Sequence, residues 1–158
     1  MVSQDFLLKR ANAKDRAAIE MLVQMAYDKW VSVIGRNPLP MDVDYQQALK
    51  DHRFDLLYKR GQDGAQNILA ALIETYEQVD CLFVENVCVS PRFQRRGLGK
   101  QLLAHAEALA IESQKPFMRL DTNKKFSGNV ELYHSLGFKT EWEKPNSGGT
   151  HVRLCKAL

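Results

Sequence analysis

Six residues between positions 92 and 100 have the types and spacing of an anion-binding turn. Four are cationic and two are glycines separated by one residue: Arg92, Arg95, Arg96, Lys100, Gly97 and Gly99. A proline precedes them and an apolar helical pattern follows, so the glycines open a helix. Unsatisfied N–H groups and the helix dipole attract phosphate to such a start, and glycine lets the backbone approach an anion. Several cations in one turn favour a pyrophosphate over a lone carboxylate.

Two common phosphate-binding motifs do not fit this turn. A dinucleotide-binding fingerprint requires a third glycine three residues after the second, where this chain has Leu102. A P-loop requires a glycine five positions before the Gly-Lys pair and Ser or Thr after it, where this chain has Gln94 and Gln101. The turn therefore belongs to another kind of phosphate site.

The segment VCVSPRFQRRGLGKQLL closely resembles the acetyl-CoA-binding signature of the GNAT superfamily of N-acetyltransferases. That signature runs V-x-V-x-P, then Q/R-x-x-G-x-G/A, then an apolar helix. The matching positions are Val87, Val89, Pro91, Gln94, Gly97 and Gly99. The Q-x-x-G-x-G pattern alone is easily met by chance, whereas the preceding strand and proline make the match specific.

A second segment, LDTNKKFSGNVELYHSLGF, resembles a later part of the same family, where a helix carrying Leu-Tyr precedes a strand that opens with Gly-Phe. The matching positions are Leu132, Tyr133, Gly137 and Phe138. The opening RANAKDRAAIEMLV is similar to the family's first strand and helix. The resemblance thus covers nearly the whole chain, most weakly from residue 35 to 57.

The resemblance implies a fold and a cosubstrate. The fold is α/β (α+β), with one domain over residues 1–158. Its mixed, mostly antiparallel seven-stranded sheet splays between strands four and five and is flanked by about four helices. Acetyl-CoA lies in that opening, with main-chain groups of Val87, Cys88 and Val89 against the pantetheine arm. Backbone N–H groups that hold the pyrophosphate come from Arg95, Arg96, Gly97, Leu98, Gly99 and Lys100.

The rest of the chain supplies the elements that must position this turn. Alternation and turn residues predict strands at residues 6–11, 55–60, 65–77, 81–89, 116–122, 138–144 and 150–158. Helical spacing predicts helices at 15–30, near 45–51, after Gly97 and at 128–136. The first helix has an apolar stripe made of Ile19, Leu22, Val23, Met25 and Ala26. The strand–helix–strand unit around Gly97 is expected to be a parallel, right-handed crossover.

Transfer of an acetyl group to an amine requires an acid for the departing thiolate. Tyr133 is the candidate, because it matches the family's tyrosine near the coenzyme sulfur; the alternative is an aromatic core residue. Asn129 is a candidate contact to the coenzyme arm, and Asn123 is a second, although both can serve turns instead. The strictest form of the family has an asparagine seven residues before the tyrosine, where this chain has Phe126.

The reaction also requires a base for the attacking amine. Glu85 is the first candidate, because strand alternation places it on the same face as Val87 and Val89. A bulge in the strand would break that argument. Glu74 and Asp121 are rivals, and water can carry the proton in their place. The alternative function is a non-catalytic acyl-CoA-binding or sensing module.

The segment IGRNPLPMDVDY, residues 34–45, lies where the family shapes its acceptor pocket, and it resembles an uncharacterised bacterial subgroup. Asp42 and Tyr45 are expected to attract an amine and Trp30 to wall the pocket. The alternative is a surface loop with a polar helix cap. No feature of the sequence distinguishes a polyamine, an amino acid, an antibiotic or a protein N-terminus as the acceptor.

Composition excludes several other classes of protein. A length of 158 residues suits one domain with its own core. The net charge of +3 is too small to imply a nucleic-acid-binding role, and the RFQRR patch lacks interleaved aromatic residues. The first ten residues do not have the pattern of a signal peptide, and no apolar run is long enough for a membrane helix. Dimers through the C-terminal strands are common in the family that the chain resembles, so the resemblance allows a homodimer.

The three cysteines, Cys81, Cys88 and Cys155, lie in strand-like stretches without metal-ligand spacing. Because the cysteines are odd in number and lie in apolar stretches, we expect a reducing, cytoplasmic setting. We expect neither a disulfide framework nor a metal site. Cys88 lies between the two cofactor-strand valines. Alternation points it to the opposite face, so we interpret it as a core residue rather than a nucleophile.

Overall fold

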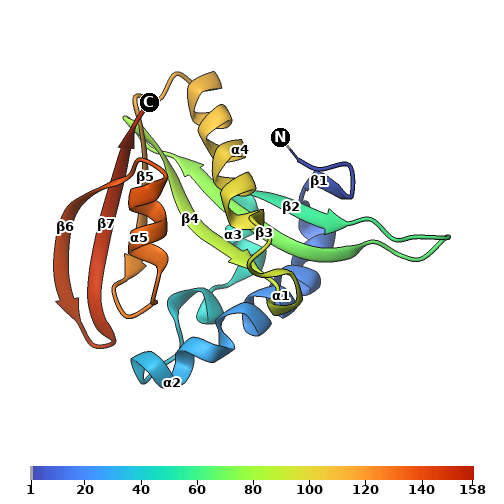
Figure 1. Ribbon diagram of the computed structural model, residues 1–158, viewed down its shortest axis with the longest axis horizontal. Helices are drawn as coiled ribbons and strands as arrows, with labels where there is room; N and C mark the ends of the chain where they lie inside the picture. The colour runs from blue at the N-terminus through green and yellow to red at the C-terminus, as the bar shows by residue number, and fades with distance from the viewer. Residues whose placement is uncertain (1) are drawn as a thin grey trace.

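A seven-stranded sheet organises the computed structural model, which describes residues 2–158 (Figure 1). The strands are β1 Phe6–Arg10, β2 Arg53–Lys59, β3 Ile68–Glu77, β4 Cys81–Val89, β5 Phe117–Asn123, β6 Lys139–Asn146 and β7 Gly149–Ala157. Their order in the sheet is β1-β2-β3-β4-β5-β7-β6. β4 and β5 pair in parallel, and the other neighbours are antiparallel.

Four α-helices of seven or more residues accompany this sheet. They are α1 Arg16–Tyr27, α3 Tyr45–Asp51, α4 Leu98–Glu112 and α5 Asn129–Ser135. Shorter turns complete the chain: 3-10 helices η1 Ala13–Asp15, η2 Asp28–Trp30, η3 Leu39–Asp42 and η4 Pro91–Phe93, and the one-turn helix α2 Val31–Ile34. The predicted fold, a mostly antiparallel seven-stranded sheet flanked by about four helices, is confirmed.

The first helix is shorter than its sequence pattern predicts. α1 ends at Tyr27, and the chain continues as η2 and then α2. Most of the expected apolar stripe is buried, but Met25 is 47% exposed and lies outside it. The chain shifts from α-helical to tighter 3-10 turns, which are common at helix ends, and Trp30 is the last residue of the 3-10 helix.

Two apolar clusters, one on each face of the sheet, hold the helices in place. α1 and α3 cover one face, where Ile19, Leu22 and Val23 pack against Phe54 and Leu72. α4 covers the other face through residues at helical spacing, namely Leu98, Leu102, Leu103, Ala106 and Ala110. Side chains of α5 join that second cluster. Burial on both faces stabilises β3 and β4, the strands that carry the candidate site.

Candidate active site

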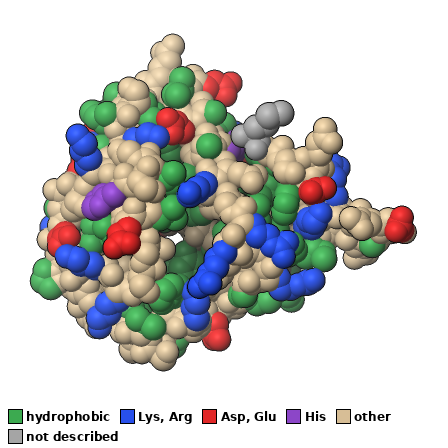
Figure 2. Space-filling view, in the orientation of Figure 1, with side chains coloured by type: hydrophobic (Ala, Val, Ile, Leu, Met, Phe, Trp, Pro, Cys, Tyr) green, Lys and Arg blue, Asp and Glu red, His purple; other side chains and the backbone are tan. Residues whose placement is uncertain are grey.

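β4 and β5 separate after a short parallel stretch and leave a cleft between them. Their pairing begins at Cys81 with Phe117 and ends at Val84 with Leu120, although both strands continue. A cavity of about 830 Å³ occupies the opening, and Figure 2 shows the hollow near the centre of the molecule. Beyond Val84 the edge of β4 that faces the cleft lacks a strand partner, so an extended ligand can add to it as a strand does.

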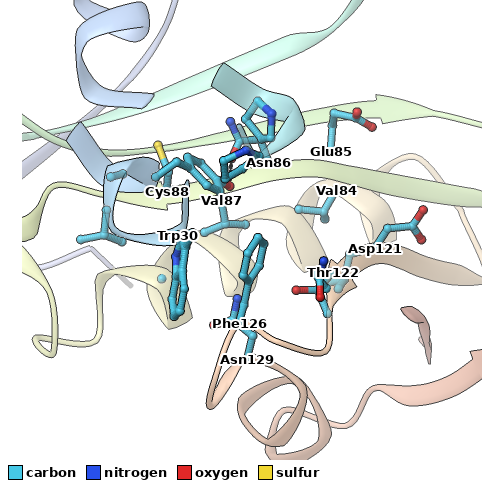
Figure 3. A pocket seen from close by; sticks show the side chains of 18 of the residues that line it. Trp30, Val84, Glu85, Asn86, Val87, Cys88, Asp121, Thr122, Phe126 and Asn129 are labelled. Carbon is cyan, nitrogen blue, oxygen red and sulfur yellow. Dashed lines mark hydrogen bonds between the residues drawn. The ribbon is translucent and has the colours of Figure 1, made fainter. Parts of the chain in front are cut away.

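A β-bulge at Glu85 changes the direction of the side chains along β4. Thr75 of β3 pairs with Val84, whereas Glu74 pairs with Asn86, so Glu85 is the extra residue. In Figure 3 Val84 and Val87 point into the cavity and Glu85 points to the opposite side of the strand. The expectation that Glu85 shares a face with Val87 and Val89 is therefore wrong, because a bulge shifts the two-residue alternation.

Glu85 nevertheless lines the cavity, on the face of the sheet away from α4. Among residues 2–158, no side chain donates a hydrogen bond or forms an ion pair to its carboxylate. Glu85 is exposed at the cavity, but partial desolvation raises the pKa of its carboxyl above the ordinary value, and the neighbouring charge of Asp121 adds to the effect. A free carboxylate with a raised pKa is suited to accept a proton.

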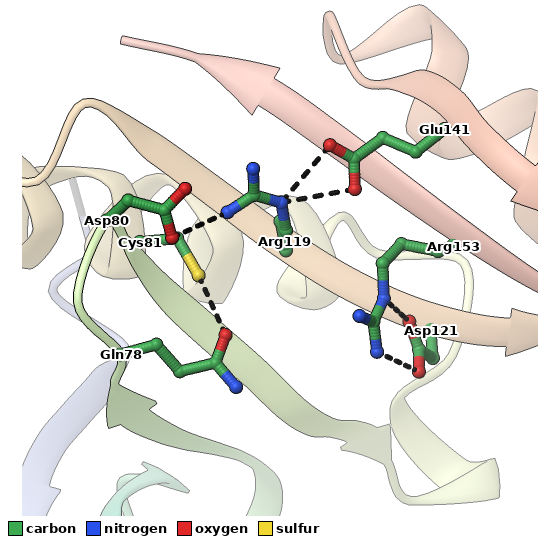
Figure 4. A network of polar contacts seen from close by, with 7 residues as sticks. All are labelled: Gln78, Asp80, Cys81, Arg119, Asp121, Glu141 and Arg153. Carbon is green, nitrogen blue, oxygen red and sulfur yellow. Dashed lines mark hydrogen bonds and ion pairs between the residues drawn. The ribbon is translucent and has the colours of Figure 1, made fainter.

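The two rival carboxylates are already engaged. Glu74 is 2% exposed, and its Oε1 lies 2.6 Å from Nδ1 of His52. Burial raises the pKa of Glu74 despite that contact. Asp121 accepts two hydrogen bonds from Arg153, at 2.7 and 2.8 Å, and lies 2.8 Å from Nε2 of His151; Figure 4 shows the bidentate pair. Both carboxylates line the cavity, but neither is free.

The glycine turn leads directly into α4. Arg95 and Gly97 have left-handed backbones, with φ of 62° and 78°, and Gly97 precedes the first helical residue without a side-chain cap. The first N–H groups of the helix are therefore available to a ligand. A Cβ built on Gly99 would meet no atom within 4 Å, and its φ is not left-handed. Neither packing nor backbone strain therefore requires a glycine at position 99, and the space beside it is open.

The cationic side chains of the turn divide into two groups. Arg95 and Lys100 line the cavity, as do Gly97, Leu98 and Gly99. Arg92 and Arg96 instead lie over the ring of Phe93, 5.7 and 5.3 Å from its centroid. In Figure 2 lysine and arginine side chains follow the edge of the central hollow. Arg96 thus contributes its backbone and not its side chain to the turn.

Gln94 links the turn to the acceptor side of the cleft. Its Nε2 donates to the carbonyl of Val89 at 3.1 Å, and its Oε1 accepts from Nζ of Lys29 at 3.2 Å. Lys29 also lies 4.9 Å from the Trp30 ring centroid and lines the cavity. Sequence reasoning missed Lys29, because no local pattern marks a lysine whose partner is 65 residues away.

Tyr133 lines the cavity from α5, and its ring packs edge-on to Phe138 with centroids 5.9 Å apart. Burial raises the pKa of Tyr133 to about 12, so the phenol keeps its proton at neutral pH. Asn129 also lines the cavity, and Figure 3 places it near Phe126. Asn123 is 7% exposed; it donates to the carbonyl of Gly148 at 3.0 Å and so holds a turn.

Only some of the residues predicted for the acceptor pocket lie at the cavity. Trp30 lines the cavity. Tyr45 reaches its wall but is 2% exposed, and its hydroxyl donates to the carbonyl of Pro40 at 2.7 Å. Asp42 accepts a hydrogen bond from Asn37 at 3.1 Å and does not line the cavity. The structure does not bring Asp42 to the site, because the 3-10 turn η3 directs it to solvent.

Cys88 is 4% exposed and packs in the cluster beneath α1 and α3. Burial raises the pKa of its thiol well above the ordinary range, which keeps the sulfur protonated and unreactive. Its main chain remains part of β4 beside the cleft, between Val87 and Val89.

A mixed sheet that parts between two parallel strands, with a phosphate-binding helix start beside the gap, defines a class of proteins that bind an extended anionic ligand along a strand edge. The chain belongs to one family of this class, the acetyltransferase (GNAT) family, whose family model matches residues 19–138. It is an acetyltransferase, and the resemblance seen in the sequence is confirmed.

Solved structures show the same fold. PaiA N-acetyltransferase of Thermoplasma acidophilum, in complex with coenzyme A, superposes with a TM-score of 0.76 at 15% identity, over 97% of this chain and 99% of that chain. The ribosomal-protein-S18-alanine N-acetyltransferase of Escherichia coli gives 0.74 at 19% identity, over 96% and 93%. An acetyltransferase of Thermus thermophilus gives 0.71 at 17% identity, over 100% of both chains.

One further comparison and two properties of the structure complete this description. A search of curated protein sequences found no match. Within residues 2–158, no helix has both the length and the apolar character needed to cross a membrane. The same part of the chain has no group of three or more His, Cys, Asp or Glu side chains arranged to hold a metal ion.

Proposed function

We propose that the protein transfers the acetyl group of acetyl-CoA to a primary amine of a small molecule or peptide, by direct attack in a ternary complex. One observation carries the proposal: a single cavity joins the start of α4, at Gly97 and Lys100, to the phenol of Tyr133 and the free carboxylate of Glu85. The anion-binding end and the proton-transfer groups therefore border the same space.

Acetyl-CoA fits the residues present. The free edge of β4 at Val87 to Val89 accommodates the pantetheine arm, and the backbone from Arg95 to Lys100 accommodates the pyrophosphate. The open space at Gly99 leaves room for it. Neighbours with coenzyme A or acetyl-CoA bound, from Thermoplasma acidophilum and Elizabethkingia anophelis, support this placement.

The chemistry balances with two protein groups. The lone pair of a neutral amine attacks the thioester carbonyl carbon, and the nitrogen loses a proton to the Glu85 carboxylate, directly or through water. The carbon–sulfur bond then breaks with its electron pair on sulfur, and Tyr133 donates its phenolic proton to that sulfur. The products are an N-acetyl amide and free coenzyme A. Glu85 accepts this proton only while its carboxylate is ionised, so protonation of Glu85 sets a lower pH limit for the reaction.

The alternative, a non-catalytic acyl-CoA-binding or sensing module, is not favoured, because the chain belongs to an acetyltransferase family. One experiment separates the two functions. Thermal unfolding is recorded with and without acetyl-CoA, and free thiol is measured in the same samples with a panel of amines. A transferase shows a raised melting temperature and thiol release with particular amines. A rise in melting temperature without release from any amine would favour the binding module, and no rise would contradict the cofactor site.

We also propose three features of the protein as a whole. Residues 1–158 act as one domain, supported by the single continuous sheet. The setting is cytoplasmic and reducing, supported by the free thiols of Cys81, Cys88 and Cys155. A homodimer forms through the C-terminal strands, supported by the edge position and exposure of β6. Sedimentation of the full chain tests the dimer.

A further inference from the structure

Three carboxylates line the cavity, and two of them already have cationic or hydrogen-bonding partners. Glu74 is held by His52 at 2.6 Å, and Asp121 by Arg153 and His151 at 2.7 to 2.8 Å. Among residues 2–158, only Glu85 of this set has no such partner. The acceptor side of the cavity therefore offers one free negative charge to an incoming ammonium group.

One part of the cavity wall is apolar. It comes from the end of α2 and the segment between α2 and α3, through the residues Ile34, Pro38, Leu39, Pro40 and Val43. Leu39 is 72% exposed and Val43 is 39% exposed, so part of this wall faces the open cavity without a protein neighbour. Apolar surface of this kind gains free energy when an apolar ligand covers it.

Hydrogen bonds fix this wall in place. The hydroxyl of Tyr45 donates to the carbonyl of Pro40 at 2.7 Å, and Nε2 of Gln24 donates to the carbonyl of Met41 at 3.0 Å. The segment has two acids, and neither lines the cavity: the carboxylate of Asp42 accepts a hydrogen bond from Asn37, and that of Asp44 caps the start of α3. These hydrogen bonds fix the position of the apolar wall, and the segment that forms it brings no negative charge into the cavity.

A second ammonium group would have no partner at this wall. Such a group would exchange water contacts for contacts with apolar side chains. Arg36, the cationic residue of the segment, also lines the cavity. The guanidinium of Arg36 is bound to the hydroxyl of Ser147 at 3.2 Å and to the carbonyl of Asn37 at 3.0 Å, not to a carboxylate. Its charge repels a second cation in the same space.

We infer that the acceptor is a monoamine: a primary amine with a single positive charge on an apolar body. This substrate class rests on the proposed function and narrows it, because it excludes polyamines and polycationic antibiotics as preferred acceptors. The amino group lies toward Glu85, and the apolar body lies against Leu39 and Val43.

A matched pair of amines tests the inference. Hexylamine and 1,6-diaminohexane have nearly the same length and volume but differ by one terminal positive charge. Thiol release is measured at saturating acetyl-CoA, and kcat/KM for the diamine is halved to correct for its two equivalent amino groups. We expect hexylamine to be favoured by about tenfold or more, because even one apolar group distinguishes substrates by ~10-fold or more in such a pocket.

Two variants of Leu39 separate the effect of an added negative charge from the effect of losing the apolar side chain. Leu39→Asp supplies the missing carboxylate, whereas Leu39→Asn has nearly the same size and polarity without a charge. Both variants lower kcat/KM for hexylamine, but only Leu39→Asp improves the relative rate of the diamine, by about two- to fivefold over Leu39→Asn, because an ion pair at so exposed a position is weak. The melting shift with acetyl-CoA, retained in both variants, confirms that they fold and bind the cosubstrate.

The outcomes distinguish the inference from the function on which it rests. Equal or faster acetylation of the diamine by the wild-type protein overturns the monoamine class and leaves the transferase intact. The same ratio in Leu39→Asp and Leu39→Asn also overturns it. Failure to acetylate hexylamine, the diamine and every other amine contradicts both the inference and the proposed function.

Discussion

The indole of Trp30 and the phenyl ring of Phe126 face each other across the cleft, with centroids 5.0 Å apart and ring planes inclined by 34°. Trp30 belongs to η2 on one side of the split sheet, and Phe126 to the loop between β5 and α5 on the other; Figure 3 shows both at the cavity. Segments that flank the two halves of the sheet thus contact each other at the cavity. Where the strictest form of the family has a polar asparagine, this chain has one ring of an aromatic pair.

Removal of one ring from this pair should weaken cosubstrate binding. We expect Phe126→Ala to raise KM for acetyl-CoA by up to about tenfold, because loss of a ring contact that contributes ~0.5–1.5 kcal/mol loosens the wall of the cavity in which the cosubstrate is proposed to bind. The chain has two tryptophans, so Trp142→Phe leaves Trp30 as the sole indole emitter. In that background acetyl-CoA should shift the Trp30 emission, and Phe126→Ala should change the shift. An unchanged KM for acetyl-CoA, together with a Trp30 emission that does not respond to acetyl-CoA, would contradict a role of this aromatic pair in cosubstrate binding.

The open space at Gly99 predicts opposite effects on stability and on binding. Leucine is a better helix former than glycine by ~0.5–1 kcal/mol, and a Cβ at Gly99 meets no atom within 4 Å outside the backbone of its own helix. Gly99→Leu should therefore melt at the same or a higher temperature, yet bind acetyl-CoA at least about tenfold more weakly, since its side chain fills the ligand's space.

Two glycine variants serve as controls for that prediction. Gly99→Ala, which the signature allows, should retain binding. Gly97→Ala should instead lose ~1 kcal/mol of stability, because the φ of 78° at Gly97 is unfavourable for alanine. Calorimetric titration with acetyl-CoA and thermal unfolding give both quantities; normal affinity in Gly99→Leu would place the pyrophosphate elsewhere.

Tyr133→Phe removes the proposed acid and little else. The pKa of about 12 keeps the phenol protonated through the working range, so the variant should lose about 10²-fold in kcat. Its melting shift with acetyl-CoA should persist, because the ring still packs against Phe138. A variant that keeps full kcat would assign Tyr133 to packing alone.

Glu85→Gln tests the base through the pH profile. Because partial desolvation raises the pKa of Glu85 above that of an ordinary glutamate, activity should fall as the pH drops through that raised value and the carboxylate becomes protonated. The variant should lose this acidic limb and about 10²-fold in kcat. A weakly basic amine is the suitable acceptor, since its own titration then masks less of the limb. Asp42→Asn, outside the cavity, is the matched control and should behave as wild type.

A buried ion-pair cluster predicts the acid stability of the fold. Asp55 is 2% exposed, with Nε of Arg53 at 2.8 Å and Nε2 of His105 at 3.2 Å. Burial alone raises the pKa of Asp55, but the contacts from His105 and Arg53 outweigh it and hold the pKa below its ordinary value. A depressed pKa stabilises the folded state above the unfolded pKa of ~3.9, and this stabilisation is lost as pH falls.

Asp55→Asn should accordingly lower the free energy of unfolding by about 2 kcal/mol at neutral pH, since Arg53 is partly solvated. The difference from wild type should shrink below about pH 4. Urea unfolding at both pH values measures it, with the exposed Asp5→Asn as control. An equal difference at both pH values would contradict an ionic origin.

The phosphate turn and the strand before it were readable from the sequence because their determinants are local. Three features depend only on neighbours in the chain: the left-handed backbone at Gly97, the uncapped helix start and the apolar run at residues 81–89. The expected split between the fourth and fifth strands also proved correct, through resemblance to the family rather than through any local pattern.

Direction and partnership of the side chains depend on contacts between distant segments. The bulge at Glu85 arises in the register with β3, and the partners of Glu74 and Asp121 lie 22 and more residues away. Alternation along one strand therefore predicts the wrong face for Glu85 and cannot tell a free carboxylate from a paired one.

The sequence by itself determined the family, the order of the elements and the anion-binding turn, since these depend on residue types and short spacings. Only the tertiary structure decided which carboxylate is free, that Asp42 lies outside the cavity, and that Trp30 meets Phe126 across it. The physical reason is that charge pairing, burial and aromatic contact act through space, between segments that folding alone brings together.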